Sequence, residues 1–206
     1  MSTTSVEIDA GQRGPADHSI REQIVSAANA HFSRYGYDKT TVSDLAEAIG
    51  FSKAYIYKFF DSKQAIGEAI CTQCLASISN DVTAAIADGK SASDKLRRMF
   101  RKTVESSVAL FFNDRKLYDI AAHSSSERWR SSTLHSERMY QVLSEVIVEG
   151  RSSGEFERKT ALDETCRAIL QAMQPFMNPV MLQYQLDQVP DASNEVIALI
   201  LRSLAP

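Results

Sequence analysis

The sequence predicts an all-α protein with a small N-terminal helical unit and a larger C-terminal helical body. Only eight glycines and five prolines occur among 206 residues, so turn signals are too sparse for many β-strands. Hydrophobic residues make up 44% and charged residues 24% of the chain, which is typical of a globular protein with an ordinary core. Apolar residues recur at helical spacing through most of the chain.

The N-terminal segment divides into a polar tail and a first helix. Residues 1–18 contain Gly and Pro and show no apolar periodicity, which predicts a disordered tail. From Ser19 onward, apolar residues recur at helical spacing, so we expect one buried stripe along this helix. Gly36 is free to adopt a positive φ and should end the helix.

Two short helices follow. In "DKTTVSDLAEAIG", either Thr40 or Thr41 suits the N-cap position, and Asp44 can complete a capping box with Thr41. Gly50 should stop this helix after two turns. A third short helix is expected over 52–59, directly after the turn. The two lengths and the tight turn between them are typical of a helix-turn-helix.

The stretch "FSKAYIYKFFDSK" at 51–63 should have two faces. Four apolar side chains fall together and should pack against the preceding helices, namely Phe51, Ile56, Phe59 and Phe60. The other side carries Lys53, Ala54, Tyr55 and Lys58, with Tyr57 at the edge. No acidic residue occurs from 48 to 60, so this side should be cationic although the whole chain has a net charge of −3. A local basic patch is what contact with a phosphate backbone requires.

Longer helices make up the rest of the chain. Asp61 or Ser62 should cap a fourth helix that runs to about Asp88. Pro175 and Pro179 lack amide donors and should break or kink the helix that contains them. Further helices are expected near 92–111, 115–122, 126–151, 161–174, 178–186 and 191–204.

Over "ANAHFSRYGYDKTTVSDLAEAIGFSKAYIYKFFDSKQAI" the sequence resembles the N-terminal domain of the tetracycline-repressor (TetR) family of transcription regulators. Members of that family have a run like "GVSKGTLYHYFPSKEALL", which here reads "GFSKAYIYKFFDSKQAIG". The resemblance has no gaps and covers about 40 residues, roughly a fifth of the chain. Beyond it, only the layout of long helices and a G-x-F sequence at 154–156 match. The resemblance implies a three-helix DNA-binding domain followed by a ligand-binding and dimerisation domain.

The resemblance also implies roles for individual residues. Thr40 and Thr41 correspond to the family's phosphate contact at the start of the second helix. The base-reading positions are Ser52, Lys53, Ala54 and Tyr55, and the positions that grip the phosphate backbone are Tyr57, Lys58 and Lys63. Ala54 replaces a usual Gly and Tyr55 a usual Thr, so the base-reading surface should be bulkier than is typical of the family.

An effector pocket in the C-terminal body, and a homodimer formed by its last two long helices, are further implications of the resemblance. Seven side chains are candidates for contact with a small apolar or aromatic effector: Phe111, Tyr118, His123, Trp129, Met173, Phe176 and Met177. Aromatic and Met residues at helical spacing also form ordinary cores, so a packed body remains the alternative. The segment "ASNEVIALILRSLA" is apolar on more than one face, which fits a dimer interface.

Other classes of site find less support. Cys71 and Cys74 form a "CTQC" pair with spacing that could suit zinc or redox chemistry, but no second Cys/His pair lies nearby in sequence. A buried hydrophobic role is commoner for cysteine. No Ser-His-Asp set, paired carboxylates or phosphate loop stands out, so we expect no enzyme, cofactor or metal. Three cysteines, no bilayer-length apolar run and no signal sequence predict a cytoplasmic protein with no membrane partner.

We therefore predict a disordered tail at 1–18, a helix-turn-helix DNA-binding domain at 19–66, and a helical ligand-binding and dimerisation domain at 67–206. The expected function is that of a repressor that binds a palindromic double-stranded operator as a dimer and is released by a small molecule. Two alternatives remain open. One is a DNA-binding dimer without a ligand, and the other is a helical enzyme or scaffold whose N-terminal unit only resembles a regulator.

Overall fold

Helices are the only regular elements in the parts of the chain that the computed structural model describes, residues 15–113 and 117–206. None of these helices is both long and apolar enough to cross a membrane. The all-α prediction is therefore confirmed for the described residues. The elements are α1 (Pro15–Tyr35), α2 (Val42–Ile49), α3 (Lys53–Ile56), α4 (Lys63–Ala87), α5 (Ala92–Val108), the π-helix η1 (Ala109–Asn113), α6 (Tyr118–Ser126), α7 (Arg130–Ser153), α8 (Leu162–Met177), α9 (Pro179–Leu182) and α10 (Asp191–Ser203).

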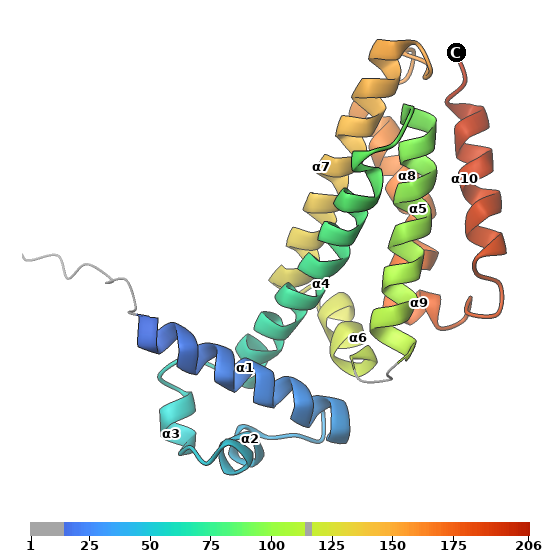
Figure 1. Cartoon of the computed structure of the whole chain (residues 1–206). Coiled ribbons are helices and arrows are strands. Elements are labelled where there is room, and N and C mark those ends of the chain that lie inside the picture. The colour runs from blue at the N-terminus through green and yellow to red at the C-terminus, as the bar shows by residue number, and fades with distance from the viewer. Residues whose placement is uncertain (1–14, 114–116) are drawn as a thin grey trace, which may run out of the picture.

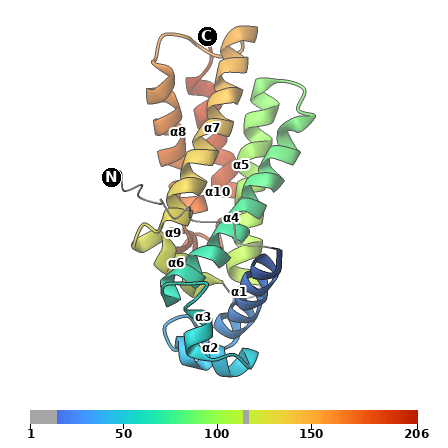
Figure 2. The same cartoon turned by 90° about the vertical axis from the view of Figure 1, so that its left-hand side faces the viewer.

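The N-terminal unit lies at one end of an elongated molecule. Figure 1 shows α1 lying across the lower end of the helical body, with α2 and α3 beyond it. The long α4 rises from this unit and packs between α5 and α7, while α8 and α10 complete the body. The short α6 and α9 lie in the half of the body nearer α1, and the C-terminus lies at the opposite end in both views (Figures 1 and 2). The helix-turn-helix is thus remote from the C-terminus but joined directly to the body by α4.

The starts of the short helices follow from local capping. The Thr41 hydroxyl accepts from the amide of Asp44, and the Asp44 carboxylate accepts from the amide of Thr41, so the predicted capping box forms at α2. Gly50 ends α2 with a φ of 77°, a conformation that glycine adopts without steric cost. The hydroxyls of Ser52 and Ser62 cap α3 and α4.

Two clusters of buried side chains stabilise the fold. The first joins α1, α2, α3 and the start of α4 around Phe32, Leu45, Ile56 and Ile70, and it also takes in Trp129 from the segment before α7. The second fills the body between α4, α5, α7, α8 and α10. Because α4 contributes to both clusters and runs unbroken through 66–67, the domain boundary that we place there stays a prediction.

Two N-terminal helix limits differ from those predicted. The first helix begins at Pro15 and not at Ser19, because the fixed φ of proline suits a first helical turn and Asp17 lies favourably near the N-terminus. The remainder of the predicted tail, 1–14, lies outside the described residues. Helix α3 ends at Ile56 and continues as hydrogen-bonded turns, in which the amides of Phe59 and Phe60 donate to the carbonyl oxygen of Ile56.

The middle of the chain shows larger differences from the predicted helix limits. The helix after Ala92 passes into a π-helix at Ala109, which the apolar pattern did not reveal. The break between α6 and α7 lies at 127–129, whereas the predicted helices end at 122 and begin at 126. Arg128 adopts a φ of 53° there, and no glycine or proline in the sequence indicates this turn. The Trp129 amide donates to the carbonyl oxygen of Ser124 across this break, so a backbone hydrogen bond ends α6.

Only one of the two neighbouring prolines breaks α8. Pro175 lies inside α8 without ending it, so the helix extends to Met177, past the predicted limit at 174. Pro179 does end the helix, because the residue before a proline is forced towards extended backbone and Asn178 has φ −79° and ψ 121°. The Asn178 side-chain oxygen then accepts from the amides of Val180 and Met181 and caps α9.

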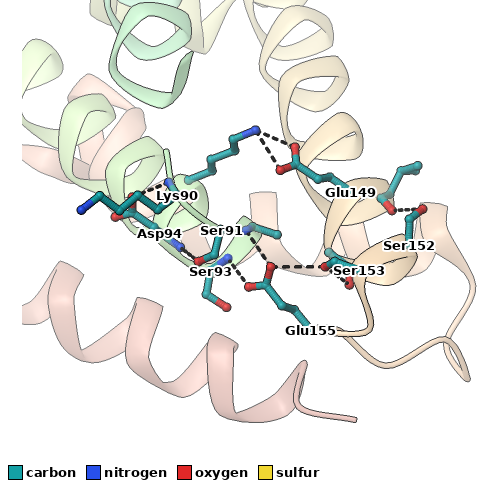
Figure 3. A network of polar contacts seen from close by, with 12 residues as sticks. Lys90, Ser91, Ser93, Asp94, Glu149, Ser152, Ser153 and Glu155 are labelled. Carbon is teal, nitrogen blue, oxygen red and sulfur yellow. Dashed lines mark hydrogen bonds and ion pairs between the residues drawn. The ribbon is translucent and has the colours of Figure 1, made fainter. Parts of the chain in front are cut away.

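The end of the body remote from α1 is held by the segment after α7. Glu155 accepts hydrogen bonds of 3.1 Å from the amides of Ala92 and Ser93, the first amides of α5 (Figure 3). A carboxylate is favoured there because these amides have no partner within the helix. Phe156 is buried against Gly150, where an added Cβ would lie 2.1 Å from its ring. In the G-x-F sequence, Glu155 thus binds the start of α5 and Phe156 packs against α7.

Candidate nucleic-acid interface and ligand cavity

The α3 segment presents the two faces that the sequence predicts. Ile56, Phe59 and Phe60 are buried in the N-terminal cluster. Arg21 of α1 donates to the Phe59 carbonyl oxygen at 2.8 Å, and its guanidinium lies 4.1 Å from the centre of the Phe60 ring. The outward side chains, all exposed, are Ser52, Lys53, Ala54, Tyr57 and Lys58. The packing of three apolar residues therefore orients a cationic face outward.

Tyr55 belongs partly to both faces. Its ring is half-buried and meets Phe51 and Phe59 edge-to-face, at centroid distances of 5.0 and 5.3 Å. The Lys58 ammonium lies 5.6 Å from the centre of the same ring, within the range of a cation–π contact. The ring of Tyr55 is thus less exposed than we predicted, because it packs between Phe51 and Phe59.

The two threonines before α2 have different environments. Thr40 is only 1% exposed, and its hydroxyl donates to the carbonyl oxygen of Gly36 at 2.8 Å. The hydroxyl proton of Thr40 is thus already used within the protein, and the phosphate contact of this residue stays a prediction. Thr41 is exposed, but its hydroxyl donates to the Asp44 carboxylate at 2.8 Å. Hydrogen bonds from Thr41, first from its amide, hold the pKa of Asp44 below its usual value.

Lys63 is tied to the loop between α1 and α2. Its ammonium donates to the carbonyl oxygen of Tyr37 at 3.0 Å and lies 4.2 Å from the centre of the Tyr37 ring. Tyr37 is itself buried, which raises the pKa of its hydroxyl to about 12. Lys63 therefore joins the start of α4 to this loop, whereas Lys53 and Lys58 are exposed and lie near the rings of Tyr57 and Tyr55.

A cavity of about 80 Å³ lies between α4, α6, α7, α8 and η1. Helix α4 and η1 supply an apolar wall that includes Ile70, Leu75, Leu110 and Phe111. Polar lining residues come from α6, α7, α8 and the residue after α8, and they include Ser124, Ser125, Ser132, His135, Gln174 and Asn178. Concave apolar cavities with a few convergent polar groups are the usual sites for small molecules.

His135 is the titratable imidazole of this cavity. Its Nδ1 lies 3.0 Å from the hydroxyl oxygen of Ser79. The same hydroxyl oxygen lies 3.1 Å from the carbonyl oxygen of Leu75, so Ser79 joins the imidazole to the backbone of α4. Burial lowers the pKa of His135 to about 4, so the side chain is neutral at pH 7.

The two cysteines of α4 line the same cavity. Burial raises the pKa of the Cys71 thiol to about 12 and also raises the pKa of Cys74. Both are free thiols, and a raised pKa disfavours the thiolate that metal binding and thiol exchange need. Within residues 15–113 and 117–206, no group of three His, Cys, Asp or Glu side chains is arranged to hold a metal ion.

The seven predicted effector contacts are dispersed. Phe111 and Met177 line the cavity. The other five lie elsewhere: Tyr118 beside Phe112 in a separate surface pocket, His123 opposite Asp38, Trp129 in the N-terminal cluster, and Met173 and Phe176 in buried packing. Aromatic and Met content indicates only apolar lining, so the polar lining residues were not predicted. The serine-rich run at 124–126 and 131–132 was the available signal.

The N-terminal unit meets the body at Tyr37 and Trp129. The two rings pack edge-to-face with centroids 5.5 Å apart. The indole nitrogen of Trp129 donates to Glu127 at 2.8 Å, which fixes the ring from the α6 side. At Gly67 of α4, an added Cβ would lie 2.9 Å from the Trp129 ring, so only glycine permits this close approach. Helix α6 both lines the cavity and contacts, through His123, Asp38 in the loop that leads into α2.

Two descriptions of one protein family match this chain. Residues 24–70 match "Bacterial regulatory proteins, tetR family". Residues 92–197, more than half of the chain, match "Tetracyclin repressor-like, C-terminal domain".

Curated relatives are similar over a short stretch. The biofilm operon icaADBC HTH-type negative transcriptional regulator IcaR of Staphylococcus aureus is 36% identical over 61 residues, which cover 30% of this chain and 33% of IcaR. The HTH-type transcriptional repressor Rv1474c of Mycobacterium tuberculosis is 42% identical over 53 residues, or 26% of this chain and 28% of the relative. The match thus spans a third or less of the length of these curated relatives.

Solved structures are similar over nearly the whole chain. The regulator FadR from Bacillus subtilis, in complex with stearoyl-CoA, superposes with a TM-score of 0.66 at 20% identity, covering 89% of this chain and 98% of FadR. The fatty acid degradation regulator FadR from Bacillus halodurans gives a TM-score of 0.67 at 20% identity, covering 93% of this chain and 97% of that one. At such identities the likeness concerns the fold.

Proposed function

Because this chain belongs to the TetR family of bacterial regulatory proteins, we propose that it is a repressor that binds a palindromic DNA operator as a homodimer and is released by a small effector. The observation that carries the proposal is the α3 surface. Three apolar side chains hold this segment to the bundle, and its exposed side carries two lysines with no acid between 48 and 60. A local cationic face on a helix-turn-helix suits the major groove of DNA.

Within that face, Ser52, Lys53, Ala54 and Tyr55 read base edges. Tyr55 is held by aromatic neighbours, so it presents a rigid edge that can meet a thymine methyl group. Tyr57 and Lys58, both exposed, contact the phosphate backbone. Thr41 is the exposed threonine at the start of α2. Its amide and hydroxyl donate to the Asp44 carboxylate, so they must leave Asp44 in order to donate to a phosphate.

Lys63 has a second role in this proposal. Its ammonium already has a carbonyl partner in Tyr37, so a phosphate contact there would use its remaining donors. The lysine can then join the phosphate backbone to the loop before α2. Residues 19–66 act as the DNA-binding domain and 67–206 as the body.

The proposed dimer uses the last long helices, α8 and α10. Leu199 of α10 is 60% exposed, a large apolar side chain without cover in a single chain. In a two-fold dimer of this kind, the two α3 helices reach half-sites about 34 Å apart, one turn of DNA. The operator should therefore be close to palindromic. The partners are a second copy of this chain and double-stranded DNA, in the cytoplasm.

The effector is a small apolar or aromatic molecule bound in the cavity. Helix α6 contributes Ile120, Ala121 and Ser124 to the cavity wall, and its outer side carries His123 towards Asp38 of the α1–α2 loop. A ligand that binds better when α6 is displaced favours a state in which the loop and α2 are displaced too. This release mechanism distinguishes the proposal from a dimer that binds DNA without a ligand.

A footprinting experiment on the DNA upstream of the protein's own gene tests the proposal. We expect two protected half-sites with a centre-to-centre spacing of one helical turn. Lys53→Ala should weaken protection, whereas Lys159→Ala, which removes an exposed lysine outside the helix-turn-helix, should not. Protection that is absent, or that persists unchanged in Lys53→Ala, would contradict the proposal.

A further inference from the structure

The cavity wall carries no net charge. Among its described lining residues there is no Asp, Glu, Lys or Arg. The groups that could ionise are His135 and the thiols of Cys71 and Cys74, and burial keeps all three neutral at pH 7. A charged group on a ligand would therefore be desolvated here without an opposite charge to meet it, at a cost of several kcal/mol.

Most of the polar lining residues of the cavity come from α6, α7 and α8. Helix α7 contributes only polar side chains, Ser132, His135 and Ser136, whereas α4 and η1 contribute aliphatic, aromatic and thiol groups. Most of the polar atoms already have partners. The Ser124 hydroxyl lies 2.6 Å from that of Ser132, and the Asn178 side-chain amide donates to Ser125 at 2.7 Å.

Gln174 differs from these neighbours. Its side chain lines the cavity and is partly buried, yet no hydrogen bond engages its amide among the described residues. An amide offers both a donor and an acceptor, so it can pair with a hydroxyl, a carbonyl or an amide of a ligand. The unused hydrogen-bonding groups of the cavity thus include the side-chain amide of Gln174 on α8.

The size of the cavity limits the apolar part of a ligand. Its volume is about 80 Å³, whereas an engineered cavity that binds benzene measures ~150 Å³. A single ring or a short alkyl group can enter if Met177, a flexible side chain at the wall, adjusts. A long acyl chain would require far more rearrangement.

We infer that the cavity selects a small uncharged molecule, with an apolar body of about one ring and one hydroxyl, carbonyl or amide group that Gln174 binds, and that it rejects carboxylates, amines and acyl-CoA esters. The apolar body lies against α4 and η1, and the polar group points to α7 and α8. This inference rests on the proposed function, since it names the chemical class of that effector.

Four probes with one ring and one substituent carbon test the inference: toluene, benzyl alcohol, benzoate and benzylamine. Binding to the full chain at pH 7.5 is measured by titration calorimetry and by the shift in melting temperature. We expect benzyl alcohol to bind most tightly and toluene roughly 2- to 10-fold more weakly, as the loss of one hydrogen bond implies. Benzoate and benzylamine should bind roughly 100-fold more weakly than benzyl alcohol.

Matched variants show whether the probes occupy this cavity. Ala121→Leu adds bulk to the wall and should abolish binding, whereas Ala122→Leu changes the next residue of α6, which does not line the cavity, and should not. Gln174→Leu should remove the advantage of benzyl alcohol over toluene without abolishing the binding of either. Gln171→Leu, an exposed position on the same helix, is its control.

The outcomes separate this inference from the proposed function. Benzoate or benzylamine binding as tightly as benzyl alcohol, with sensitivity to Ala121→Leu, would overturn the selection of neutral ligands but leave an effector site in place. No binding by any of the four probes to a protein that binds its operator would also overturn it. Release of that operator by an acyl-CoA ester would then show that the effector proposal survives with a different ligand class.

Discussion

The imidazole Nε2 of His123 lies 2.9 Å from Oδ1 of Asp38 and 3.0 Å from Oδ2, joining α6 to the loop between α1 and α2 across 85 residues of sequence. The other ring nitrogen lies 3.5 Å from Glu127. His123 therefore sits between two carboxylates, one from each part of the molecule. Through this contact and the packing of Tyr37 on Trp129, the proposed displacement of α6 would reach the helix-turn-helix.

The His123–Asp38 contact should make stability depend on pH. The hydrogen bond to Asp38 is the main cause that raises the pKa of His123 above its usual value in the folded protein. A raised folded pKa means that the contribution is complete below the unfolded pKa of about 6.5 and is lost as pH rises through the folded value. His123→Gln should therefore lower the melting temperature at pH 6 more than at pH 8.5. An equal loss of melting temperature for His123→Gln at both pH values would contradict an ionic contact.

His135 should make stability fall as the pH falls, the opposite of the effect of His123. Its pKa is lowered to about 4, so between pH 6.5 and 4 the unfolded chain takes up a proton that the folded chain does not, and stability falls as pH falls. The slope is at most ~1.4 kcal/mol per pH unit for one group. Urea unfolding at pH 7.5 and pH 5 measures it, with His135→Gln as the non-titrating variant. The difference in unfolding free energy between wild type and variant should change with pH, and a constant difference would mean that His135 is not buried neutral.

Lys58→Ala should weaken binding to all DNA sequences by a similar factor. Its ammonium is exposed beside the Tyr55 ring, and loss of one phosphate contact lowers the slope of log K against log salt by about 0.9. Titrations at several salt concentrations measure the slope, with Lys159→Ala as the control. A slope equal to that of wild type would show that Lys58 does not contact the phosphate backbone.

Two substitutions at Tyr55 should distinguish its packing role from a contact with DNA. Tyr55→Ala removes two edge-to-face contacts, with Phe51 and Phe59, and should cost ~1–3 kcal/mol of stability. Tyr55→Phe keeps the ring and should stay within ~0.5 kcal/mol of wild type. If the ring touches a base, Tyr55→Phe should keep the sequence preference at that position and Tyr55→Ala should lose it. A uniform loss of affinity across operator sequences in Tyr55→Ala would place Tyr55 in packing alone.

The sequence predicted features that depend on neighbouring residues. Thr41 with Asp44 forms the expected cap, Gly50 the expected left-handed end, and Ile56 points inward as its spacing indicates. Each of these depends on interactions within a few positions of the chain. The inward and outward sides of α3 were therefore accessible before the structure was known.

Other features were not predicted. Arg128 turns the chain with a positive φ where no glycine or proline stands, and Thr40 is buried although its neighbour Thr41 is exposed. The cavity wall combines serines of α6 and α7 with Gln174 of α8, which only tertiary packing brings together. Aromatic content pointed instead to Trp129, which packs on Tyr37 of the N-terminal unit.

The most direct test of the account is a binding titration that compares the DNA upstream of the protein's own gene with a shuffled duplex of the same composition. At ~150 mM salt we expect the upstream duplex to bind roughly 1,000-fold more tightly, as specific operators do. Lys53→Ala should reduce this ratio, because its side chain lies on the exposed face of α3. Equal affinity for the two duplexes would contradict sequence-specific recognition by the α3 surface.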